Sequence, residues 1–188
     1  MVYTTPEGIS VLDLKTDAAR SVVNGNVPII VTGHKTQNVY YTKDGAVFAT
    51  DVDSGVTREI AKLPARGSVV TVNGDETLLA GTTTEGAAPP TNRPSAGGRG
   101  GPQQLELGLP RDREAQLDAR LSARIPMTIF NIDTRTGEQK TIHRATDWLN
   151  HLEFSPTDPS LLMFCHEGPP AHHVDGDLRP RVLEFGRQ

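Results

Sequence analysis

A pattern that recurs about every forty residues limits the folds open to this chain. Three segments have the same order of a short apolar strand, a polar turn containing Asp or Asn, and a second short strand: residues 9–23, 47–63 and 128–143. Aligning the copies on Asp13, Asp51 and Asn131 places the second copy one period after the first and the third copy two periods after the second. A period of about 40 residues is typical of the antiparallel blades of a β-propeller.

A second repeat runs half a period out of phase with the first. Residues 69–81 and 152–164 each contain a strand, a turn rich in Gly, Asp or Pro, and another strand, and Asn73 and Ser155 are again two periods apart. Two phases with one period predict an all-β fold, an incomplete β-propeller of about three to four blades. An open β-meander or sandwich with regular hairpins stays open as the alternative, because it has similar turn spacing.

One stretch of the chain interrupts this pattern. Residues 86–110 are rich in Gly and Pro, and they have too few apolar side chains to compensate the entropy of ordering. The predicted organisation is propeller blades in residues 1–84, a flexible Gly/Pro-rich insert in 85–110, a short helix in 111–124, a further blade in 125–169, and an irregular or disordered tail in 170–188. Leu117 and Leu121 give the helix one apolar face.

Charge and composition exclude several classes of partner and compartment. The net charge is −4 and the pI is about 5.8, so the chain has no cationic field for nucleic acid or an anionic membrane surface. Cys165 is the single cysteine, so no internal disulfide can form. The N-terminal segment lacks a basic start followed by an apolar run. These features predict a soluble, intracellular protein.

Histidines provide the main chemical signal. Four of the six lie close together near the C-terminus, namely His151 at the start of a predicted strand, His166, His172 and His173. His166, His172 and His173 are candidate zinc ligands of a hydrolase, although no CxxC or HExxH pattern accompanies them. Cys165 cannot form a catalytic dyad with His166, since neighbouring strand residues point to opposite faces. A structural or solvated role is the alternative for each histidine.

Five segments carry a resemblance to a known family. They are residues 32–41 (TGHKTQNVYY), 72–86 (VNGDETLLAGTTTEG), 123–127 (ARIPM), 136–151 (TGEQKTIHRATDWLNH) and 154–169 (FSPTDPSLLMFCHEGP). Together they resemble the bacterial oligogalacturonate lyases, and the chain looks like the N-terminal half of that family. The resemblance implies a seven-bladed propeller that cleaves oligogalacturonides from pectin by β-elimination, with a manganese ion at the funnel and a cytoplasmic location.

The resemblance also implies roles for three residues. Elimination removes the C5 proton of a uronate and needs a base with a pKa near the working pH, which suits an imidazole. His151 matches the family's histidine at this position and is the expected C5 base. Arg124 is the expected guanidinium for the substrate carboxylate, and His166 the expected substrate contact or support. A solvated Arg124 and a hairpin-capping His166 are the alternatives.

The resemblance departs from the family near the C-terminus. In the family the metal ligands follow the CHEGP hairpin in later blades, whereas this chain ends at Gln188, soon after Pro169. The Mn²⁺ ligands are therefore expected beyond the end of this chain, and the isolated chain is expected to lack metal and activity. The alternative function is a non-catalytic propeller fragment that acts as a binding or interaction module. The expected partners are oligogalacturonides, with no nucleic acid or membrane, and self-association through open blade edges.

Overall fold

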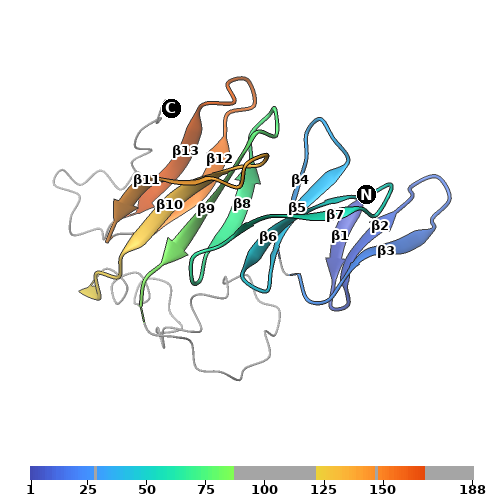
Figure 1. Cartoon of the computed structure of the whole chain (residues 1–188), viewed down its shortest axis with the longest axis horizontal. Coiled ribbons are helices and arrows are strands. Elements are labelled where there is room, and N and C mark those ends of the chain that lie inside the picture. Colours follow the sequence, from blue (N-terminus) through green and yellow to red (C-terminus); the bar gives the residue numbers. More distant parts are fainter. Residues whose placement is uncertain (28, 87–121, 147, 168–188) are drawn as a thin grey trace.

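The structure is a computed structural model, and it describes residues 1–27, 29–86, 122–146 and 148–167. These residues form antiparallel sheets that follow one another in chain order (Figure 1). The first sheet contains β1 (Val2–Thr5), β2 (Gly8–Leu12) and β3 (Ala19–Asn24). The second contains β4 (Ile30–Thr32), β5 (Asn38–Lys43), β6 (Ala46–Asp51) and β7 (Thr57–Lys62). The third contains β8 (Ser68–Val72), β9 (Leu78–Thr84), β10 (Met127–Asp133) and β11 (Gln139–Ala145), and the fourth contains β12 (Trp148–Phe154) and β13 (Leu162–Glu167).

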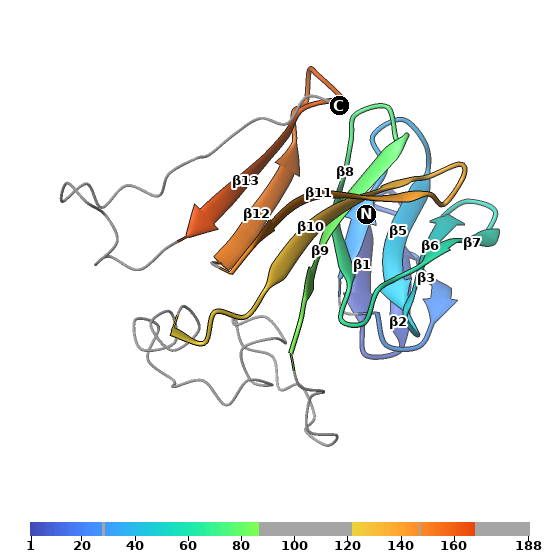
Figure 2. The same cartoon turned by 60° about the vertical axis from the view of Figure 1, so that its left-hand side comes forward.

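The sheets are arranged as blades. Each is a meander of consecutive strands, and β8 contacts both β4 and β12, so these three strands are the innermost of their sheets. Figure 2, turned by 60°, shows the same succession of sheets from another side. The prediction of an all-β, incomplete propeller of three to four blades is confirmed. Within the described residues no helix has both the length and the apolar character needed to cross a membrane.

The first sequence repeat corresponds to one hairpin used in three sheets. In each hairpin an aspartate N–H donates to the carbonyl five residues later: Asp13 to Ala18 at 2.9 Å, Asp51 to Val56 at 3.0 Å and Asp133 to Glu138 at 2.9 Å. Each carboxylate also accepts backbone N–H groups of the turn, from Lys15, Ser54 and Thr136 respectively. Such side chains stabilise tight turns, and these backbone hydrogen bonds lower the pKa of all three carboxyls.

A register shift accompanies every one of these turns. It follows Ile9, Val47 and Ile129, each four residues before the aspartate. The third copy therefore aligns on Asp133, and the alignment on Asn131 is wrong by two residues. Asn131 is instead a buried residue of β10. The error arises because Asn131 and Asp133 are both polar and lie two residues apart in β10, so the pattern of strand, polar turn and strand fits either residue.

The repeat shows which blade positions are filled. In the two four-stranded sheets the aspartate hairpin joins the third and fourth strands, and β6 and β10 are the third strands. The same hairpin joins β2 to β3, so β1 takes the place of a second strand. The first sheet therefore has no innermost strand among the described residues. The fourth sheet contains a first and a second strand. In the part of the chain that the structure describes, β1 pairs only with β2 and β13 only with β12. Exposed strand edges favour association, so self-association stays a prediction.

The Gly/Pro-rich insert belongs to a single blade. Its flanking strands β9 and β10 pair from Met127 opposite Thr84 onward, and the Glu85 N–H donates to the Pro126 carbonyl at 2.9 Å. The insert therefore leaves and re-enters the third sheet at one point. Residues 87–121 and 168–188 lie outside the described residues, and so do most of the predicted insert, most of the predicted helix and all of the predicted tail.

Three apolar clusters hold adjacent sheets together. One lies between the first and second sheets around Ile9 and Val39, one between the second and third around Val47 and Leu79, and one between the third and fourth around Ile129. All five side chains are fully buried. Burying a Val, Leu or Ile side chain contributes about 1.5–3 kcal/mol each, so contacts between sheets are a main source of stability.

We expect Ile129→Ala to lower the free energy of unfolding by about 2–5 kcal/mol, because it leaves a cavity between two sheets. Val56→Ala is the matched control, since Val56 is 67% exposed in a turn and its truncation should change stability by about 0.5 kcal/mol or less. Urea unfolding followed by circular dichroism measures both. Equal losses for the two variants would contradict the assignment of the core.

Candidate active site and comparisons with known proteins

Two of the three candidate site residues, Arg124 and His166, share one end of the third and fourth sheets. In an antiparallel meander β10 and β12 begin at the end where β9, β11 and β13 finish. Arg124 lies three residues before β10 and His166 is the last residue but one of β13. The topology thus brings Arg124 and His166 to the same end, although they belong to different sheets and lie far apart in the sequence.

His151 lies in an irregular part of β12. It is the fourth residue of the strand, so the expectation that it opens the strand is wrong. The register of β12 against β13 shifts between Asn150 and Glu153, and His151 has a φ of 50° and an exposed side chain. Bulges re-aim side chains near functional sites, and a positive φ outside glycine is a sparsely populated conformation. His151 therefore combines a bulged strand with an uncommon backbone conformation.

His166 packs against a histidine that the sequence did not single out. Its ring lies 5.9 Å from the ring of His143 on β11, edge to face, and His143 also contacts Phe164 at 5.4 Å. The His143 Nε2 atom is buried and has no hydrogen bond within the described residues. Cys165 pairs with Asn150 in the ladder while His166 pairs with Leu149, so Cys165 and His166 lie on opposite faces, as predicted.

Arg124 is exposed in the segment that leads into β10, with a φ of 45°. A second arginine lies nearby. A Cβ placed on Gly86 would sit 3.5 Å from a guanidinium nitrogen of Arg66 and 3.9 Å from Ile125, the residue after Arg124. Arg66 comes from the connection between the second and third sheets. No motif in the sequence marked Arg66, because its position depends on how two sheets meet.

Metal binding is not supported by the side chains that the structure describes. Among these residues no group of three or more His, Cys, Asp or Glu side chains is arranged to hold a metal ion. His172 and His173, the other two candidate zinc ligands, lie outside the described residues.

The opposite end of the sheets contains a buried carboxylate that joins two blades. Glu76, in the β8–β9 turn, accepts hydrogen bonds from the backbone N–H groups of Lys35 and Thr36, at 2.5 and 2.7 Å, and from the hydroxyls of Thr36 and Tyr40, at 2.5 and 2.8 Å. Burial disfavours the charged form, but these donors outweigh it and lower the Glu76 pKa to about 2. Burial and the hydrogen bond to Glu76 raise the Tyr40 pKa to about 12.

We expect Glu76→Gln to lower the free energy of unfolding by about 1.5–3 kcal/mol, because hydrogen bonds to a charged acceptor are lost. The Glu76 pKa is about 2 in the folded chain against an ordinary 4.5. Its stabilisation is therefore complete above about pH 4.5 and is lost as the pH falls toward 2. Urea unfolding at several pH values should give wild-type and Glu76→Gln chains that converge in stability below pH 4.5. Glu138→Gln, at an exposed position, is the control, and a constant difference across this range would contradict the role of the charge.

No family model matches the chain. An oligogalacturonate lyase of Dickeya dadantii is 44% identical over 41 residues, which is 22% of this chain and 11% of that protein. The structure of an oligogalacturonate lyase in complex with manganese superimposes with a TM-score of 0.63 and 22% identity, over 86% of this chain and 40% of that one. The chain is similar to the oligogalacturonate lyases.

A second solved structure gives the same result. The oligogalacturonate lyase of Vibrio parahaemolyticus superimposes with a TM-score of 0.65 and 21% identity, covering 88% of this chain and 40% of that chain. The resemblance inferred from sequence segments is confirmed, and so is the propeller fold. The chain spans about 40% of the length of these oligogalacturonate lyase structures.

Proposed function

We propose that this chain carries part of an oligogalacturonate lyase site, with His151 as the base and Arg124 as the carboxylate-binding group. The proposal rests on the similarity to oligogalacturonate lyases. The observation that carries it is the position of His151, exposed in a bulge with a positive φ, in the blade that follows Arg124. Substrate, reaction and location in the cytoplasm are parts of this proposal.

In the proposed reaction the His151 imidazole accepts the C5 proton of a uronate. The electron pair of the C5–H bond forms a double bond between C4 and C5, and the bond from C4 to the glycosidic oxygen breaks with its electrons on that oxygen. Between removal of the proton and cleavage of the C4–O bond, negative charge develops on the uronate carboxylate. A cation beside this carboxylate therefore lowers the barrier. Arg124, with Arg66 as a second guanidinium near Ile125, would bind the carboxylate and orient C5 toward His151.

His166 and His143 would act through packing. Their edge-to-face contact at 5.9 Å joins β11 to β13, the strand that pairs with β12. We assign them a positioning role for the bulge at His151. Manganese occurs in a similar lyase, but the described residues of this chain do not offer a fitting ligand group.

We expect Arg124→Ala to weaken digalacturonate binding about tenfold or more, because a charge-assisted hydrogen bond to the carboxylate is lost. Arg135→Ala is the matched control, since Arg135 is exposed in the β10–β11 turn at the opposite end of the sheet. Isothermal titration calorimetry on the full chain measures both. Equal affinities for the two variants would overturn the role of Arg124, and no binding by the wild-type chain would leave only the similarity of fold.

We expect the full chain, given digalacturonate and Mn²⁺, to form no unsaturated uronate, because it spans about 40% of the length of the oligogalacturonate lyase structures that it resembles. Ultraviolet absorbance of the product measures this. Steady turnover would refute the expected inactivity and would allow a direct test of His151. In that case His151→Ala should lower the rate about 100-fold or more, whereas an unchanged rate would exclude His151 as the base. A non-catalytic binding module predicts no turnover and a digalacturonate affinity that His151→Ala leaves intact.

A further inference from the structure

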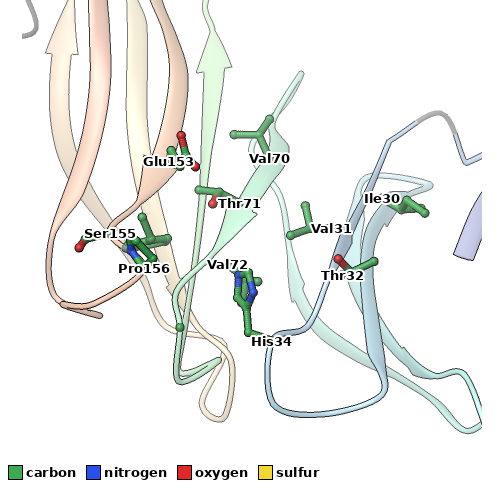
Figure 3. A pocket seen from close by; sticks show the side chains of 12 residues that line it. Ile30, Val31, Thr32, His34, Val70, Thr71, Val72, Glu153, Ser155 and Pro156 are labelled. Atoms are coloured by element: carbon green, nitrogen blue, oxygen red, sulfur yellow. The ribbon is translucent and has the colours of Figure 1, made fainter. Parts of the chain in front are cut away.

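A cavity lies along the innermost strands, away from the end that carries Arg124 and His166. Its volume is about 440 Å³, within the range of small-molecule pockets. The residues that line it come from the later halves of β8 and β12, from β4 and from the turns that follow these strands. Figure 3 shows Val70 and Thr71 of β8 between Val31 of β4 on one side and Glu153 of β12 on the other.

Hydrogen bonds between blades hold the rim of this cavity in place. Glu76 binds the backbone of Lys35 and Thr36, which follow the cavity residue His34. The Asn73 side-chain amide donates to the Pro159 carbonyl at 3.0 Å, which joins the β8–β9 turn to the β12–β13 hairpin. Three hairpins are thus fixed to one another. A cavity with fixed walls binds without first ordering its own loops.

The polar groups of the cavity are available to a ligand. The Glu153 carboxylate and the His34 imidazole are exposed, and the Thr71 side chain is half-buried. Within the part of the chain that the structure describes, none of these three side chains has a hydrogen bond or ion pair. Val70, 38% exposed, and Val31 add apolar surface beside them. Carboxylate, imidazole and hydroxyl therefore surround an apolar strip.

We propose that this cavity binds a neutral sugar, at a site separate from the proposed lyase site. A carboxylate accepts hydrogen bonds from hydroxyl groups, and imidazole and Thr hydroxyls both donate and accept them. Val31 and Val70 would pack against the C–H face of the ring. The Glu153 charge repels a ligand carboxylate at close range, so the cavity selects a neutral sugar over a uronate.

Galactose and galacturonate test this selection, because they differ only in the carboxylate at C6. Titration of the ¹⁵N-labelled full chain with each sugar is followed by amide chemical shifts. Galactose is expected to shift the amides of Val70, Thr71 and Glu153 and to bind at least fivefold more tightly there than galacturonate. Glu153→Gln is expected to bring the two affinities within twofold. Glu138→Gln is the control and should retain the preference.

Several results would overturn the proposal. One is that galactose produces no saturable shift of the cavity amides. Another is that the two sugars bind the wild-type chain with equal affinity, and a third is that Glu153→Gln leaves the preference for galactose unchanged. Thr71→Val is a second variant, expected to weaken galactose binding at least threefold, and an unchanged affinity would also count against the site. Arg124→Ala should leave galactose binding unchanged, so failure of the lyase proposal and failure of this one are told apart.

Discussion

Each sheet of this protein is stabilised by the faces that it buries against the sheets before and after it. The apolar clusters around Ile9, Leu79 and Ile129 lie between sheets. An isolated two-stranded hairpin is marginally stable at best in water, so the fourth sheet depends on its packing against the third. Hydrogen bonds of Glu76 join the second sheet to the third, and a hydrogen bond of Asn73 joins the third to the fourth.

This arrangement produces two chemically different regions on the same strands. One end carries the arginines and histidines that suit a uronate, with Arg66 and Ile125 both within reach of Gly86. The later halves of the innermost strands carry Glu153 and His34 beside valines. The difference follows from antiparallel topology, because each innermost strand passes from one end to the other and presents a few residues at each. Under the two proposals, the opposite charge at these regions would lead them to bind different sugars.

Much of the fold could be predicted because the repeat is local. The aspartate turns depend on side chains that bond the backbone two or three residues away, and such turns leave a signature in sequence. The third copy was aligned on Asn131 instead of Asp133 because both are polar and lie two residues apart on one face of β10, so the sequence pattern fits either residue. Arg124, His151 and His166 were selected by resemblance, whereas Arg66, His143 and Glu153 had no sequence signal.

The sequence by itself determined the all-β architecture, the period of the blades and the positions of the tight turns, because these follow from hydrophobic alternation and contacts between near neighbours. Tertiary structure alone decided that His143 meets His166, that Glu76 binds a loop 40 residues earlier in the chain, and that three innermost strands line an open cavity. The physical reason is that these contacts depend on the packing angle between sheets, to which residues far apart in the chain contribute together.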